Sequence, residues 1–336
     1  MKIISDLPDY IISRIRKTIS DGQYKSISDF ILMATENQLA LESGEINNVL
    51  DISNENSKDS MLSIIKNFSI INSEIPILEY FPAREGKDIW DNWIWGQINR
   101  IFPIKFAARF LAIESSRLGS YPEKENFNKI VSKEARDLGI ILKNIDSILD
   151  KERDKKLSTG FPIGRKIENS LKRYWSQFVG YQKSDKTLTG ALFDLALANL
   201  FTDEDGVLRI GLNSKGKKFS QLNNPILDNK DFSCSLSELE ISFYLEHIKS
   251  NVPGEFSLFS NVLNLLINGI ERREEMNVEL ARLIKGSGWS DSLISTQRAG
   301  AISRLFELGL VSKERIGLEV RYHITERGKT WLGIST

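Results

Sequence analysis

The sequence predicts a mainly helical protein of several domains, and three observations carry that prediction. Apolar side chains recur at the three- and four-residue spacing of amphipathic helices in many segments of the 336-residue chain. A polar stretch over residues 43–60 separates a short N-terminal module from the rest. Two segments 112 residues apart, which begin at Arg209 and Arg321, share one order: a short strand, a polar cap, a basic-Gly-Lys triplet and an aromatic residue.

Composition narrows the class of protein. Hydrophobic residues make up 41% and charged residues 27%, which is typical of a folded domain with its own core. The single cysteine, Cys234, excludes an intrachain disulfide. No apolar run approaches the roughly 20 residues that span a bilayer, and the N-terminus lacks the apolar stretch of a signal peptide. We therefore expect a cytoplasmic protein without membrane contact.

Charge is balanced overall but unevenly distributed. The chain has 45 basic and 45 acidic residues. Residues 151–186 hold ten bases against four acids, residues 295–336 hold seven against four, and residues 45–90 hold eight acids against four bases. A neutral total with basic islands is compatible with DNA contact through local elements, because counterion release needs clustered Lys and Arg. Many enzymes have the same pattern.

The first forty residues predict one strand and two helices. A short extended run ends at Pro8, which is tolerated at the first position of a helix. A first helix is predicted from four isoleucines at helical spacing, Ile11, Ile12, Ile15 and Ile19. Gly22 ends this helix. Ser26 or Ser28 can cap a second helix. Elements this short cannot bury a core alone, so we expect two chains to pair.

These features resemble the ribbon-helix-helix family. The similarity is carried by the strand that ends in Leu7-Pro8-Asp9, by Gly22 in the turn and by residues 24–30, which open the second helix. It implies a homodimer whose paired strands enter the major groove of DNA and whose second helix holds a phosphate at its N-terminus. The implied contacts are Lys2 and Ile4 on the strand and Lys25 and Ser26 at that helix.

The sequence departs from this pattern at Asp6, which faces the groove and repels phosphate. The resemblance therefore supports dimerisation through this module better than it supports base reading by its strand. A plain helical hairpin is the alternative.

The central region is predicted to be helical, with a core that includes Trp90, Trp93 and Trp95. Helices are expected from Pro103 and over residues 123–150, and a loop over residues 155–164. A helix over Thr189–Phe201 carries no Lys or Arg and is expected to be structural or protein-binding. The helix before it carries four basic residues, which could contact DNA nonspecifically or form a solvated face: Arg165, Lys166, Lys172 and Arg173.

The two repeated segments, each preceded by a helix and a turn, resemble the winged helix-turn-helix. In the C-terminal copy, helices are expected over residues 257–269 and 271–285, and Ser295 or Thr296 caps a third helix that ends near Leu308. We expect its core face to hold Ala299, Ile302, Leu305 and Phe306. The opposite face, with small residues Gly300 and Ala301, would then lie against a major groove.

The resemblance implies a set of DNA contacts in this C-terminal copy. Glutamine can pair with adenine and arginine with guanine, while a two-stranded wing with its tip at Gly317 can hold phosphates. The expected contacts are Thr296, Gln297, Arg298 and Arg304 on the helix, and Lys313, Arg315 and Arg321 on the wing. Packing or dimerisation without DNA contact is the alternative for this domain.

Nothing in the sequence indicates catalysis. His247 and His323 lie in different segments, and one cysteine cannot complete a structural zinc cluster with them. The common hydrolase and nucleotide-binding motifs are missing. We expect no cofactor, no metal and no enzymatic activity.

The expected organisation follows from these elements. It comprises a ribbon-helix-helix module over residues 1–43, a linker and entry segment over 44–85, a central helical region with a winged-helix-like unit over 86–230, and a C-terminal winged helix-turn-helix over 235–336. The expected function is a sequence-guided, homodimeric, double-stranded DNA-binding protein, and a transcription regulator in particular. The alternatives are a nonspecific architectural DNA-binding protein and an adaptor or antitoxin-like subunit whose winged helices bind protein.

Overall fold

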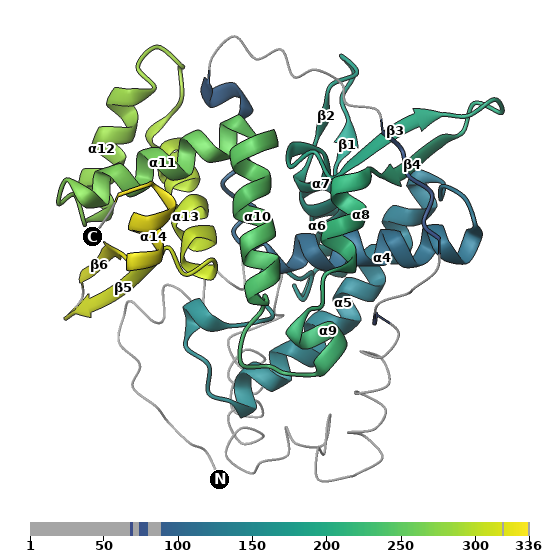
Figure 1. Cartoon of the computed structure of the whole chain (residues 1–336), viewed down its shortest axis with the longest axis horizontal. Coiled ribbons are helices and arrows are strands. Elements are labelled where there is room, and N and C mark those ends of the chain that lie inside the picture. The colour runs from purple at the N-terminus through teal and green to yellow at the C-terminus, as the bar shows by residue number, and fades with distance from the viewer. Residues whose placement is uncertain (1–67, 70–73, 80–88, 318, 335–336) are drawn as a thin grey trace, which may run out of the picture. The chain divides into compact units, whose positions relative to one another are not determined.

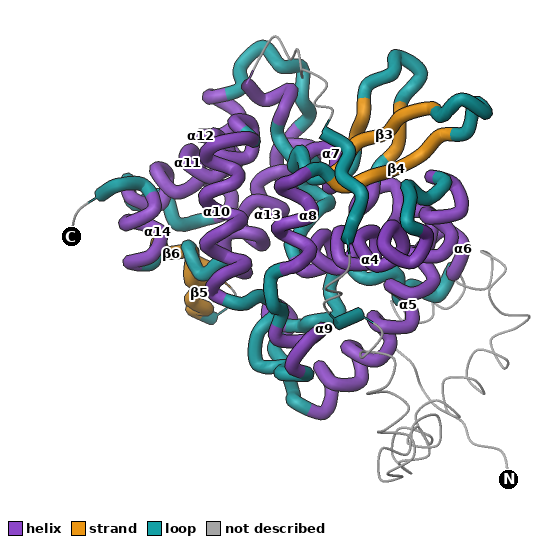
Figure 2. Tube along the Cα trace, turned by 45° about the vertical axis from the view of Figure 1, so that its right-hand side comes forward, coloured by secondary structure: helices purple, strands orange, loops and turns teal. Residues whose placement is uncertain are grey.

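A computed structural model describes residues 68–69, 74–79, 89–317 and 319–334. The chain divides into two compact units, residues 1–62 and residues 63–336. The predicted ribbon-helix-helix module lies outside the described residues, together with Lys2, Ile4, Lys25 and Ser26. The described part is mainly helical with short antiparallel strand pairs, which confirms the predicted fold class for this part of the chain (Figures 1 and 2).

The first half of the second unit combines long helices with two short hairpins. Its elements are η2 (Ile89–Asn92), α4 (Phe102–Leu118), α5 (Lys124–Ile148), η3 (Arg153–Lys155), α6 (Ile167–Tyr174), the π-helical turn η4 (Trp175–Val179), β1 (Tyr181–Gln182), β2 (Leu188–Thr189), α7 (Ala191–Asp194), β3 (Ala198–Thr202), β4 (Leu208–Leu212) and α8 (Ser214–Gln221). Strands β1 and β2 form one antiparallel pair and β3 and β4 another.

The described second half also combines helices with a hairpin, but it contains a single hairpin. Its elements are α9 (Pro225–Asn229), α10 (Glu238–Asn251), α11 (Pro253–Ile267), α12 (Arg273–Leu283), α13 (Asp291–Glu307), β5 (Val311–Ile316), β6 (Glu319–Ile324) and α14 (Glu326–Trp331). Proline begins α11 and lies in the first turn of α4, as expected of a residue that lacks a backbone donor. Ser237 and Glu240 form a capping box that begins α10.

The repeat seen in the sequence extends to backbone pairing. In the central copy, Arg209 on β4 pairs antiparallel with Glu123, the residue before α5. In the C-terminal copy, Arg321 on β6 pairs in the same way with Arg272, the residue before α12. A matching hydrogen bond lies beside each pair. The N–H of Ile210 donates to the carbonyl oxygen of Pro122, the N–H of Tyr322 donates to that of Glu271, and both bonds measure 3.1 Å.

The helix after each hairpin begins in one way in both copies. The side chain of Asn213 accepts from the N–H of Gly216 in α8, and that of Thr325 accepts from Gly328 in α14. A Cβ on Gly216 would lie 1.9 Å from the carbonyl oxygen of the residue before β3, and one on Gly328 would lie 2.5 Å from its counterpart before β5. Glycine is therefore required in both basic-Gly-Lys triplets, and the two copies are structural repeats.

The copies differ in the helix that precedes the hairpin. In the C-terminal copy this is α13, an uninterrupted helix of 17 residues. In the central copy the same place holds α6, η4, the β1–β2 hairpin and the four-residue α7. The predicted helix over Thr189–Phe201 is wrong, because Ala196 takes a left-handed conformation at φ 50° and the chain then pairs with β4 as β3.

A loop from the central region packs directly onto the C-terminal copy. A Cβ on Gly300 of α13 would lie 2.1 Å from the carbonyl oxygen of Gly96, and a Cβ on Gly96 would lie 2.3 Å from that of Thr296. The rings of Trp93 and Trp289 meet edge to face beside this contact, with centroids 5.8 Å apart. Residues 89–101, predicted as part of the central region, thus share their core with α11 and α13.

Gly300→Ala is expected to lower the free energy of unfolding by about 1–3 kcal/mol, because backbone atoms of the facing loop leave no room for a methyl group. This clash outweighs the opposing gain in helix propensity of about 1 kcal/mol. Urea denaturation measures the change. Ser303→Ala, at a half-buried position of the same helix, is the control, and a Gly300→Ala protein more stable than wild type would contradict the contact.

Candidate nucleic-acid interface

The predicted DNA-reading face of α13 is buried. Arg304 has no exposed surface and pairs with Glu255 of α11 at 2.6 Å, and Glu255 is equally buried. The Arg304 guanidinium also donates to the carbonyl oxygen of Ile98. Ala299, predicted to face the core, is exposed. Ile302 and Leu305 of the predicted core face are buried as expected, but the predicted DNA-reading face is buried as well, because the Gly96 loop covers Gly300.

The other predicted contacts on α13 are also enclosed. Gln297 and Arg298 are 2% and 5% exposed. Arg298 donates to the Asn277 side chain at 2.8 Å, and burial lowers the pKa of its guanidinium. Thr296 is half-buried and donates its hydroxyl to the carbonyl oxygen of Ser292. In this conformation, Gln297, Arg298 and Arg304 are not available to a duplex.

The wing offers one free cation within the described range. Lys313 pairs with Asp154 at 2.9 Å and lies over the ring of Phe306. Arg321 lies 3.8 Å from Glu319. Arg315 is exposed and has no ion pair with a described residue. The predicted wing residues do lie on one hairpin, β5–β6, but most of their charge is neutralised by carboxylates of the chain itself.

Four other exposed cations lie close together on α6 and on the two residues before it. Arg165, Lys166, Lys172 and Arg173 are exposed, and none forms an ion pair with another described residue. Glu168 is the one acid between residues 165 and 176. The arrangement gives α6 and the two residues before it a strongly cationic outer face. We call this surface the α6 face and define it by those four residues and Asn169, which is also exposed.

The inner side of α6 is fixed to the core. Tyr174 is buried and donates its hydroxyl to the carbonyl oxygen of Pro103 at 3.1 Å. Its ring lies among aromatic neighbours, stacked on Phe161 and tilted against Phe178. Ser170, one turn earlier, accepts from the N–H of Gly164. Helix α6 also lies along α5 (Figure 2). The cationic face is therefore presented by a helix with a fixed position.

A buried lysine lies beneath the end of this helix. Lys124 begins α5, is 4% exposed and has no carboxylate partner in the described part of the chain. Its ammonium group donates to the Asn128 side chain and lies 5.6 Å from the ring centroid of Trp175 in η4. Burial lowers the pKa of Lys124 to about 7. Near neutral pH this amine is therefore partly uncharged.

Lys124→Met is expected to remove a pH dependence of stability. An unfolded lysine titrates near pH 10.4 and the folded one near pH 7, so the folded state binds the proton more weakly. Wild-type stability should therefore rise between pH 7 and about 10. The variant should be more stable than wild type at pH 7 by about 3–5 kcal/mol, and by little at pH 10. Urea titrations at several pH values test this, and parallel curves for the two proteins would contradict it.

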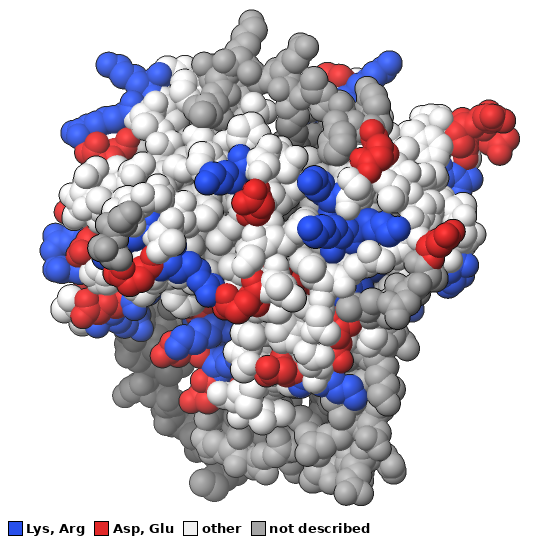
Figure 3. All heavy atoms as spheres, viewed as in Figure 1, with Lys and Arg blue, Asp and Glu red and all other residues white. Residues whose placement is uncertain are grey.

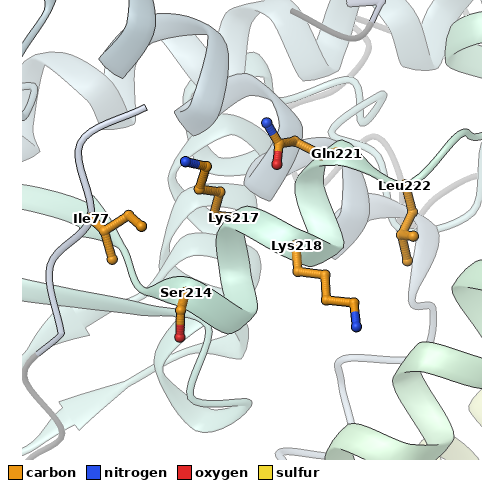
Figure 4. A pocket seen from close by; sticks show the side chains of 6 residues that line it. All are labelled: Ile77, Ser214, Lys217, Lys218, Gln221 and Leu222. Carbon is orange, nitrogen blue, oxygen red and sulfur yellow. The ribbon is translucent and has the colours of Figure 1, made fainter. Parts of the chain in front are cut away.

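A second cationic surface surrounds α8. Lysines 215, 217 and 218 line two grooves of about 290 and 390 Å³ on either side of this helix, and Lys218 borders both. Figure 3 shows basic side chains gathered where Figure 1 places α8. In Figure 4, however, Lys217 and Lys218 point in opposite directions. Glu79 already accepts from the N–H of Ser214 at 3.0 Å, and Glu246 lines the second groove. The cations around α8 therefore point to different sides of the helix and lie near acidic residues, so they form a less continuous cationic surface than the α6 face.

The remaining candidates do not form a reactive centre. His247 is buried and bonded to the carbonyl oxygen of Leu195, whereas His323 lies between Glu271 and Glu314 on the wing. Within the described ranges no group of three or more His, Cys, Asp or Glu residues could hold a metal ion. No helix of this part is both long and apolar enough to cross a bilayer.

Comparison with known proteins found no matching family model, no similar curated protein and no similar solved structure. Of the sequence-predicted contacts, the structure buries three on α13 and leaves Arg315 exposed on the wing. Of the four basic residues that the sequence marked only as possible nonspecific contacts, Lys172 and Arg173 lie on α6, and Arg165 and Lys166 directly precede it. The pattern that could have ranked them higher is the pair of buried positions one turn apart, Ser170 between the charges and Tyr174 directly after them.

Proposed function

We propose that this chain binds double-stranded DNA through the α6 face. The observation that supports the proposal is the set of four exposed cations on α6 and the two residues before it, with one acid among them and no ion pairs to other described residues. Surface cations near carboxylates usually pair with them. Cations left without such partners can bind phosphates and release the counterions of the duplex.

The shape of α6 supports the same partner. An α-helix with its side chains is about 10–12 Å wide, close to the roughly 12 Å width of the major groove. Exposed arginine and lysine side chains at both ends of the helix can bind phosphates along the groove. Asn169 lies between them, and an asparagine amide can pair with adenine through two hydrogen bonds. Sequence preference would therefore depend on Asn169 and the two arginines.

The wider role proposed is that of a homodimeric transcription regulator. It rests on the resemblance of residues 1–43 to the ribbon-helix-helix family, which lies outside the described residues. A dimer would carry two α6 faces, and linkage of two weak contacts raises the effective affinity for paired sites. This would favour targets with two-fold symmetric or repeated half-sites.

The proposal is tested by fluorescence anisotropy of the full chain with a labelled duplex of about two helical turns. The four phosphate contacts of one α6 face contribute about −3.6 to the slope of log K against log salt, because each contact contributes about −0.9. A slope near zero, or no binding at about 50 mM salt, would contradict the proposal. Selection from a random duplex pool then separates a regulator, which enriches a motif, from an architectural protein, which does not.

An adaptor role remains the second candidate, and one observation favours it. The solvent side of α13 carries small, uncharged residues that would allow close packing of a partner helix: Ser292, Ser295, Ala299 and Ser303. Size-exclusion chromatography with and without duplex DNA distinguishes the two functions. A DNA-binding chain co-elutes with the duplex, whereas an adaptor elutes at the same volume in both runs.

A further inference from the structure

The β1–β2 hairpin is an insertion into the central copy. Residues 181–189, which we call the finger, lie where the C-terminal copy has the uninterrupted α13. The finger leaves and re-enters the fold at two glycines with left-handed φ values, Gly180 at 116° and Gly190 at 109°. A Cβ on Gly190 would lie 2.2 Å from the Cα of Gly180, so the two ends of the finger touch. A segment inserted at one point in this way can be removed without opening the core.

The finger contributes little to packing. Residues 181–187 are all exposed, and β1 and β2 rise beside α7 in Figure 1. Its shape comes from short-range bonds: the N–H of Lys183 donates to Thr187, and that of Lys186 donates to Lys183. Lys186 takes a left-handed φ of 67° to close the turn. An ordered element with so little buried surface is expected to act on something outside the chain.

The chemistry of the finger fits a polyanion. Lys183 and Lys186 project near the tip without an ion pair to any described residue. Asp185 is exposed too, and its carboxylate accepts from the N–H of Thr187 at 2.9 Å, so the finger carries two cations and one anion. The exposed residues 181–187 include no aliphatic side chain, which makes the finger a poor hydrophobic dock for a protein.

The finger also begins at the end of the α6 face. Tyr181, 41% exposed, contacts the ring of Trp175 edge to face, with centroids 6.4 Å apart. Trp175 directly follows α6, two residues after Arg173. A phosphate chain that runs along α6 would therefore reach Tyr181 and then the two lysines. The aromatic ring at this junction can stack on a sugar or an unpaired base.

We infer that the finger is a second DNA contact, in which Lys183 and Lys186 hold phosphates beyond those that the α6 face holds. The inference rests on the proposed function. It assigns a binding role to a hairpin that the C-terminal copy lacks, and it makes the central copy the principal DNA-binding half of the described unit.

The test is a salt titration of duplex binding by the full-length double variant Lys183→Gln/Lys186→Gln. Loss of two phosphate contacts should make the slope of log K against log salt about 1.8 less negative and reduce affinity roughly ten- to fifty-fold at 0.1 M salt. Lys129→Gln/Lys133→Gln on α5 is the matched control, since both lysines are exposed and lack ion pairs with described residues. This control should bind like wild type.

Excision of the finger, with Gly180 joined directly to Gly190, is expected to match the double lysine variant in affinity and to keep the wild-type melting temperature. If the excised chain fails to fold, the lysine variant, which keeps the hairpin backbone, decides the question. An unchanged slope in the lysine variant, with binding that still depends on the α6 face, would overturn the role of the finger alone. Absence of duplex binding by the wild-type chain would overturn the proposed function as well.

Discussion

Arg304→Ala is expected to lower the free energy of unfolding by about 3–5 kcal/mol, the largest loss of stability that the structure predicts for a single residue. Arg304 and Glu255 are both fully buried and joined by two hydrogen bonds, of 2.6 and 2.9 Å. Burial already raises the pKa of Glu255 despite the neighbouring arginine. Without the guanidinium, this carboxylate and the carbonyl oxygen of Ile98 would be left in the core without their donor. Chemical denaturation measures the loss.

The control for this effect replaces both partners with apolar residues. Arg304→Met combined with Glu255→Leu should recover most of the lost stability, because buried ion pairs are often no better than well-packed hydrophobic residues. A loss of less than about 1 kcal/mol in Arg304→Ala would contradict the buried pair. Any change in DNA affinity of this variant should follow the folded fraction, since Arg304 is enclosed.

Neutralising the α6 face is expected to reduce duplex affinity roughly a thousand-fold at 0.1 M salt, the largest effect on binding. The variant carries four glutamines, at Arg165, Lys166, Lys172 and Arg173. Loss of four phosphate contacts should remove about 3.6 from the magnitude of the slope of log K against log salt. Stability should change little, because all four side chains are exposed and unpaired within the described part of the chain. The measurement is again anisotropy against salt.

The matched control places the same charge change on the competing surface. Lys215, Lys217, Lys218 and Lys249 are replaced by glutamine on α8 and α10. This control should retain affinity within a few-fold of wild type, with a slope that differs far less. The reverse pattern, strong loss in the α8 variant and none in the α6 variant, would move the interface to the grooves around α8.

Individual helices and hairpins could be predicted from the sequence, because the spacing of apolar residues and the capping residues within each segment determine them. The helix predicted over residues 123–150 is confirmed as α5, Lys124–Ile148, by its apolar spacing. The two-stranded hairpin predicted after the last long helix is confirmed as β5–β6, and the 112-residue repeat extends to matched hydrogen bonds. Helix α13 begins a turn earlier than predicted, because Ser290 caps it by accepting from the N–H of Leu293.

Contacts between distant segments could not be predicted in the same way. The burial of the second face of α13 was missed because the loop that covers it, at Gly96, lies about 200 residues earlier in the chain. Arg304 appeared to be a surface cation because its buried partner, Glu255, lies on another helix. The four basic residues of α6 were visible in the sequence, but their lack of carboxylate neighbours depends on the folded arrangement.

The central claim is that a duplex covers the α6 face, and lysine acetylation with mass-spectrometric detection tests it most directly. The modification rate of each lysine is compared in the full chain with and without saturating duplex DNA. The account predicts protection of Lys166 and Lys172, and unchanged rates at Lys215 and Lys218. Equal rates at Lys166 and Lys172 in both samples, or protection confined to the lysines of α8, would contradict it.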